Sequence, residues 1–102
     1  MKLLVVMGIE AYQKELKKIL FENGVLVFSE MDASGFKIQK GDSNRSNNWF
    51  SGNKIPVYST VNLAFTEEEQ AAKVLNALEK FNSNSEVVNP FHGYQLQVEK
   101  SI

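Results

Sequence analysis

A strand pattern ends and a helix pattern begins within the stretch Thr60-Val61-Asn62-Leu63-Ala64-Phe65-Thr66-Glu67-Glu68-Glu69. Apolar and polar residues alternate strictly over 55–65, which predicts a strand with two different faces. We expect its core face to carry Ile55, Val57, Val61, Leu63 and Phe65, interrupted by Ser59. The other face would then carry Tyr58, Thr60, Asn62 and Ala64.

A helix is predicted directly after this strand. Thr66 with Glu69 three residues on has the form of a capping box, and the glutamates there suit the positive end of the helix dipole. The helix would end at Asn82-Ser83-Asn84-Ser85, and Pro90 separates it from a last alternating strand over 94–99. Its buried stripe is expected to be Ala71, Val74, Leu75, Leu78 and Phe81.

The same strand–helix–strand order is predicted for residues 2–31, which precede the stretch quoted above. A buried strand is predicted over 2–8, an amphipathic helix over 10–23, a left-handed cap at Gly24 and a second strand over 25–31. The order β-α-β, long loop, β-α-β predicts an α+β fold of the ferredoxin-like βαββαβ type. It has one four-stranded antiparallel sheet with two helices on one face. The opposite sheet face is then uncovered, and we expect it to carry Leu4, Val6, Leu26 and Phe28.

Composition narrows the class of protein. The 102 residues are enough for one domain, and the hydrophobic fraction of 43% with mixed charge indicates a folded chain. No apolar run approaches the roughly 20 residues that cross a bilayer. The absence of cysteine excludes disulfides and cysteine-ligated zinc, which fits a cytoplasmic protein.

The segment 34–56 between the second and third strands is unusually long and basic. It holds Lys37, Lys40, Arg45 and Lys54 against Asp42, a charge of +3, while the whole chain has −1 and the remainder therefore −4. Connections usually have about 4–6 residues, so a flexible loop of this length suggests a functional role. It could bind a small anion or an acidic partner, or it could simply be a solvated loop.

The start of this loop, Gly35-Phe36-Lys37-Ile38-Gln39-Lys40-Gly41, resembles the nitrogen regulatory protein PII family. The family's typical entry reads Gly-Phe-Gly-Arg-Gln-Lys-Gly, and the opening 1–6 and the run 22–25 are also similar. The resemblance implies a homotrimer whose T-loop contacts a transporter or an enzyme and whose ligands, nucleotides among them, bind between subunits. It places Gln39 near phosphate and metal, and Lys40 at a basic position of the family pattern.

The chain departs from this family at three places. The glycine- and lysine-rich phosphate loop after the second helix is replaced by residues 82–86, and the two C-terminal arginines are missing. No tyrosine lies between Ser34 and Pro56, so the modified T-loop tyrosine has no counterpart. The sequence therefore predicts a PII-like regulatory protein without enzymatic activity, with no assigned cofactor and no nucleic-acid partner.

The candidate binding residues lie mainly in the loop. We predict ligand or partner contacts from Gly35, Lys37, Gln39, Lys40, Arg45 and Trp49. Trp49 with Phe50 could instead fold back onto the body. His92, the single histidine, could bind a metal in a CutA-like trimeric metal-tolerance protein, or could be an ordinary loop residue. A small acylphosphatase-like enzyme is a further alternative. It would need an arginine in a phosphate-binding first loop, whereas the single arginine, Arg45, lies in the middle of the long loop.

Overall fold

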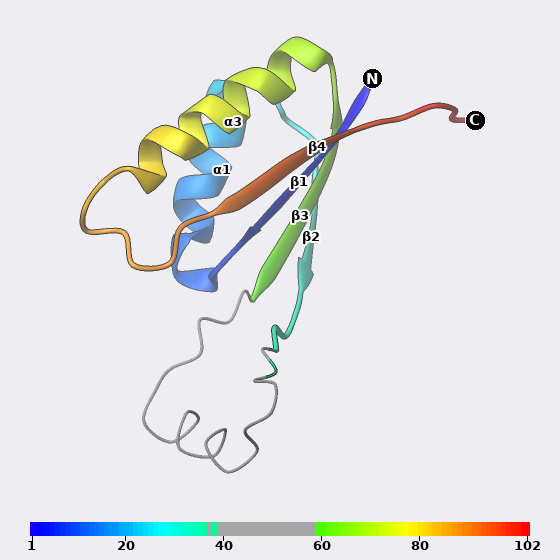
Figure 1. Ribbon diagram of the computed structural model, residues 1–102. Helices are drawn as coiled ribbons and strands as arrows, with labels where there is room; N and C mark the ends of the chain where they lie inside the picture. Colours follow the sequence, from blue (N-terminus) through cyan, green and yellow to red (C-terminus); the bar gives the residue numbers. More distant parts are fainter. Residues whose placement is uncertain (37, 39–58) are drawn as a thin grey trace.

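One antiparallel sheet in the strand order β2-β3-β1-β4 forms one layer, and two helices form the other (Figure 1). The computed structural model describes residues 1–36, 38 and 59–102. The elements in chain order are β1 (Lys2–Gly8), the short 3-10 helix η1 (Glu10–Tyr12), α1 (Gln13–Glu22), β2 (Ser29–Asp32), β3 (Thr60–Thr66), α3 (Glu68–Asn82) and β4 (His92–Gln97). The predicted ferredoxin-like fold is confirmed.

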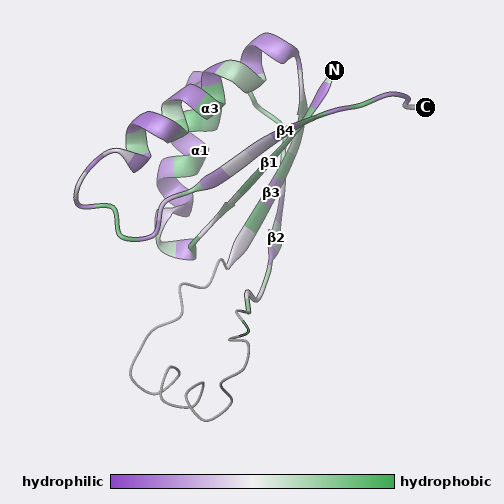
Figure 2. Ribbon diagram, in the orientation of Figure 1, coloured by the Kyte–Doolittle hydropathy of each residue, from purple (hydrophilic) through white to green (hydrophobic). Residues whose placement is uncertain are grey.

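The core lies between the sheet and the two helices. In the centre of the sheet, Leu4 and Val6 of β1 pair with Ala64 and Asn62 of β3. Both β1 side chains are buried, and much of the hydrophobic sequence of the sheet runs along β1 and β3 (Figure 2). The helices close this core with Leu16, Leu20, Ala71, Val74 and Leu78.

The prediction of which sheet residues face the helices is wrong. Leu4 and Val6, expected on the uncovered face, lie in the core, and Leu26 is exposed beside the sheet while Phe28 packs against the core. On β3 the covered residues are Thr60, Asn62, Ala64 and Thr66, and the apolar Val61, Leu63 and Phe65 face away from the helices. Right-handed crossovers put the helices on a fixed side of the sheet, and the pairing with Leu4 and Val6 then decides which residues of β3 lie beneath them.

The second strand begins later than predicted. Gly24 adopts the expected left-handed conformation, with φ of 83°. The next residue, Val25, donates its backbone N–H to the carbonyl of Leu20 and inserts its side chain into the core. This insertion keeps the chain away from β3 until Ser29, so residues 25–28 are not part of the strand predicted over 25–31.

The long helix also starts one residue later than predicted. Thr66 is still paired with Lys2 at the end of β3, and Glu67 takes the N-cap position. The capping box is therefore formed by Glu67 and Gln70, whose Oε1 accepts the backbone N–H of Glu67 at 3.2 Å. Gln70 Nε2 donates to the carbonyl of Gly24 at 2.9 Å and so joins the start of α3 to the end of α1.

A pair of buried amides crosses the core between helix and sheet. Gln13 Nε2 donates to Asn62 Oδ1 at 2.8 Å, and Asn62 Nδ2 donates to the carbonyl of Val6 at 3.4 Å. Both side chains are more than nine-tenths buried. Because a buried polar group loses its hydrogen bonds to water, each amide depends on the other for a partner.

We expect Asn62→Ala to lower the free energy of unfolding by about 1–3 kcal/mol, since Gln13 Nε2 would be left buried without an acceptor. The double variant Gln13→Leu with Asn62→Leu should lose less than the sum of the two single changes, because no donor remains unpaired. Urea denaturation followed by circular dichroism measures both. Strict additivity would contradict the coupling.

Candidate functional site

Within the part of the chain that the structure describes, the sheet face away from the helices is largely apolar. The strand register aligns its residues in three rows, Leu96–Leu3–Phe65, Tyr94–Val5–Leu63 and His92–Met7–Val61, with Met31 of β2 beside Val61. We call this set the open face. Both helices lie on the other side of the sheet (Figure 1). Phe65 is 65% exposed and Tyr94 51%, so large side chains of this face reach solvent.

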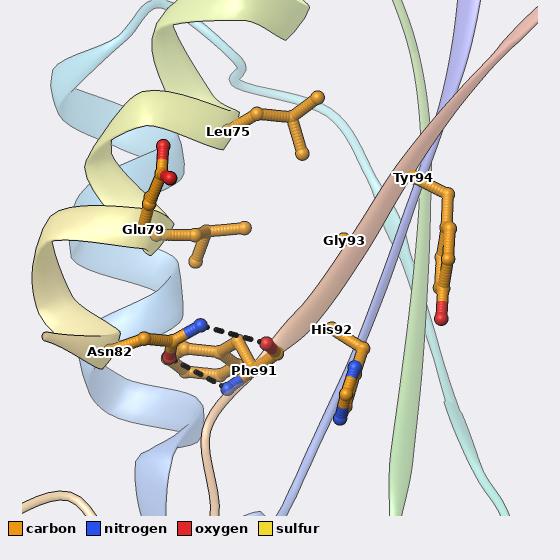
Figure 3. A pocket seen from close by; sticks show the side chains of 8 residues that line it. Leu75, Glu79, Asn82, Phe91, His92, Gly93 and Tyr94 are labelled. Atoms are coloured by element: carbon orange, nitrogen blue, oxygen red, sulfur yellow. Dashed lines mark hydrogen bonds between the residues drawn. The ribbon is translucent and has the colours of Figure 1, made fainter.

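A pocket of about 330 Å³ lies between α3 and β4 (Figure 3). Leu75 projects from α3 towards the strand, and Glu79 stands one turn further along the helix. His92 and Tyr94 project from β4 away from α3, on the side of the open face. The pocket therefore has an apolar helix wall with one carboxylate, and a strand as its other wall.

Two local features hold this pocket in shape. Asn82 at the end of α3 binds the backbone of Phe91 twice: its Oδ1 accepts the Phe91 N–H at 2.8 Å and its Nδ2 donates to the Phe91 carbonyl at 2.9 Å. This clamp starts β4 at His92 rather than at the predicted position 94. Gly93 brings the strand close to the helix, because a Cβ there would lie 2.7 Å from Leu75 Cδ2.

An aromatic cluster supports the clamp from the core side. The ring centroids of Phe81 and Phe91 are 5.2 Å apart, and that of Tyr12 lies 5.4 Å from Phe81 and 5.9 Å from Phe91. Such tilted contacts favour a fixed ring arrangement. The cluster ties the N-terminal end of α1 to the end of α3 and the start of β4.

A second, smaller pocket of about 200 Å³ follows from the late start of β2. It lies between Val27 and Phe28 on one side and Leu63, Ala64 and Phe65 on the other. Among residues 1–36, 38 and 59–102, no strand pairs with the end of β3 on this side. The pocket is continuous with the apolar open face through Leu63 and Phe65.

The predicted loop residues are placed as follows. Gly35 is half-buried after the end of β2, whereas Lys37, Gln39, Lys40, Arg45 and Trp49 lie outside the described residues. The proposed flexibility of 34–56 also stays a prediction, since residues 37 and 39–56 of that segment lie outside the described residues. The loop site therefore stays a prediction.

His92 is exposed on β4, opposite Met7. Within residues 1–36, 38 and 59–102, no three histidine, aspartate or glutamate side chains come together in a way that could hold a metal ion. In the same part of the chain, no helix has the length and apolar character needed to span a bilayer.

Sequence reasoning missed the residues that shape the pocket. The pattern around Asn82 predicts only the end of a helix, and Gly93 lies just before the predicted last strand. One signal was present: a glycine beside an alternating strand pattern often marks a close backbone approach. The pairing of Gln13 with Asn62 had no comparable local signal, since the two residues are 49 positions apart.

The architecture defines the class as a ferredoxin-like α+β domain. No family model matches the sequence, and no curated protein matches it. Solved structures do match, and they include structures of two PII-like proteins.

One of these is CPII from Thiomonas intermedia K12, described as a nitrogen regulatory PII-like protein bound to ADP, AMP and bicarbonate. The TM-score is 0.58 at 18% identity, over 99% of this chain and 94% of that one. Another is a putative PII-like signalling protein from Thermus thermophilus, with a TM-score of 0.61 at 14% identity, over 95% of this chain and 86% of that one. The chain therefore has the PII-like fold, as its loop entry suggested.

We expect Asn82→Ala to lower the free energy of unfolding by about 1–3 kcal/mol, because two backbone groups of Phe91 lose their partner. Asn76→Ala, an exposed asparagine of the same helix, is the matched control and should change it by less than about 0.5 kcal/mol. Thermal or urea unfolding measures the difference. Equal effects of the two changes would show that the clamp does not stabilise β4.

Proposed function

We propose that this chain is a non-enzymatic, PII-like regulatory protein of the cytoplasm. Three copies would cover one another's open faces, a small ligand would bind at the seams between them, and the loop 34–56 would contact a protein partner, such as a membrane transporter. The observation that carries the proposal is the open face itself: apolar residues on all four strands, in a fold shared with PII-like proteins.

The physical case for association rests on the two faces of the sheet. An antiparallel sheet in a stable monomer usually presents polar residues to water on its outer face. Here that face holds Leu3, Val5, Leu63, Phe65 and Leu96, and their burial would be favourable by about 25 cal/mol per Å² of apolar surface. A chain of 102 residues has a small core of its own, so association would add stability.

The choice of ligand follows from the distribution of charge. CPII is described as bound to ADP, AMP and bicarbonate. In this chain residues 83–91, which join α3 to β4, contain no lysine or arginine. They therefore supply no cationic side chain to bind a polyphosphate. The basic residues of the loop, Lys37, Lys40 and Arg45, are better suited to a small anion.

The mechanism is a shift of population. The anion would favour one arrangement of the loop over others, and this arrangement would have a different affinity for the partner. The ligand controls partner binding only to the extent that it binds one arrangement more tightly. The acidic remainder of the chain, with a charge of −4, keeps the positive charge concentrated in the loop.

A metal-binding role related to CutA is the second candidate. It is favoured by one observation: His92 is exposed at the edge of the open face, beside Met7. A ring of three copies would bring three His92 side chains to equivalent positions. A thermal shift with Zn²⁺ or Cu²⁺ that is lost in His92→Ala would select this function over the first.

We expect the wild-type chain to sediment as a trimer of about 34.5 kDa, three times the 11.5 kDa of one chain. Phe65→Glu should dissociate it, because a carboxylate would then be buried in the interface. Analytical ultracentrifugation measures the mass.

Val88→Glu is the matched control, since Val88 is 79% exposed and lies outside the sheet. It should leave the trimer intact. A monomeric wild-type chain at working concentration would refute the proposed assembly.

We further expect bicarbonate, ADP and AMP, tested singly by isothermal titration calorimetry, to separate anion from nucleotide binding. Alanine at Lys37, Lys40 and Arg45 together should weaken binding of the active ligand by about tenfold or more, since three cationic donors are lost. The thermal stability should be unchanged. Unaltered affinity in the triple variant would remove the loop from the site.

A further inference from the structure

Among the described residues, β4 is an edge strand of the sheet. It pairs with β1 on one side and forms the last strand in the order β2-β3-β1-β4. Val98 donates its N–H to the carbonyl of Met1 at 3.2 Å, so it forms a hydrogen-bonded pair with that residue. Such pairs recur at every second residue of an antiparallel ladder. Positions 92, 94 and 96 therefore bond to β1, and the backbone groups of Gly93, Gln95 and Gln97 point to the free edge.

The strand itself carries none of the residues that usually prevent pairing, while Lys2 Nζ of β1 donates to Gln97 Oε1 at the end of the strand at 2.9 Å. The strand His92-Gly93-Tyr94-Gln95-Leu96-Gln97 contains no proline, no lysine and no acidic residue. Natural edges are commonly blocked by charge, proline or a bulge. An edge without these features can accept a further strand.

The pocket of about 330 Å³ lies along the same edge. On the strand side of the pocket, Gly93 has no side chain and so leaves space. On the helix side, the pocket is lined by Leu75 and Leu78. An added strand would place alternate side chains on the helix side of the sheet. One of them, opposite Gly93, would enter this apolar pocket.

The helix wall is acidic on this side. By helical spacing Glu68, Ala72, Leu75 and Glu79 form one stripe along α3, while Lys73 and Lys80 fall on the opposite side of the helix. Both glutamates are exposed. Glu79 lines the pocket beside its apolar centre, and Glu68 lies two turns before Leu75 on the same stripe.

We propose that the groove between β4 and α3 binds an extended, basic segment of a partner protein as a fifth strand. The segment pairs with Gly93, Gln95 and Gln97, inserts an aliphatic side chain beside Leu75 and places a basic side chain near Glu79. The groove opens on the helix side of the sheet, so this inference goes beyond the proposed function and does not depend on the loop 34–56 or on the open face.

A designed peptide tests the proposal with the full chain. The probe is fluorescein-labelled Thr-Lys-Thr-Leu-Thr-Lys-Thr with blocked ends, in which Leu and both Lys fall on one side of a strand. Fluorescence anisotropy should detect saturable binding at concentrations up to about 1 mM. The same peptide with Glu in place of Lys should bind about fivefold more weakly, and Glu79→Lys should reduce or reverse this preference.

Two variants test the backbone pairing itself. Gln95→Pro removes an outward N–H donor and should weaken binding by about tenfold, whereas Gln95→Ala keeps the donor and should bind as the wild type does. Circular dichroism checks that both fold. Should the proline variant unfold, a probe N-methylated on its pairing amides replaces it, with the same expected loss.

Three outcomes would overturn the proposal. The first is no binding of the Lys peptide at about 1 mM, and the second is equal affinity of the proline and alanine variants, or of the methylated and plain probes. The third is self-association of the wild type that Gln95→Pro abolishes and the peptide does not inhibit, which would make a second copy the occupant. None of these depends on bicarbonate or nucleotide binding, so this proposal and the proposed function can fail separately.

Discussion

The register of β1 between β3 and β4 is the constraint on which the rest of the structure depends. Side chains of a strand alternate between the two faces of a sheet, so a fixed register assigns every residue of β1, β3 and β4 to one side at once. Leu4 and Val6 face the helices, and Leu3, Val5 and Met7 face away from them. A shift by one residue would exchange the core and the open face.

This assignment explains why β3 presents its smaller and more polar residues to the core. Leu16, Leu20, Val74 and Leu78 from the helices already fill the space above the sheet, and Ala64 leaves room for them. Asn62 is tolerated there because Gln13 supplies its hydrogen bond. The larger apolar residues of β3 are then left on the opposite side, and this distribution creates the surface through which we propose that copies associate.

The two interaction surfaces that we propose lie on one sheet. Its open face is broad and apolar, which suits contact with further copies of the chain, while its β4 edge is narrow and bordered by the acidic stripe of α3. They lie on different sides of the strand layer, and Gly93 and the Asn82 clamp shape only the second. If both proposals hold, a substitution in one surface should leave the other intact.

The sequence alone determined the order of elements, the fold class, the left-handed cap at Gly24 and the resemblance of 35–41 to PII proteins, because each depends on residues close together in the chain. It did not determine which face of β3 is buried, where β2 begins or how Asn82 binds Phe91. Alternation reveals that a strand has two faces, but Val61, Leu63 and Phe65 are more apolar than the residues that are actually covered. Only the tertiary structure decides between the faces, since the handed crossovers and the pairing with β1 involve residues more than fifty positions apart.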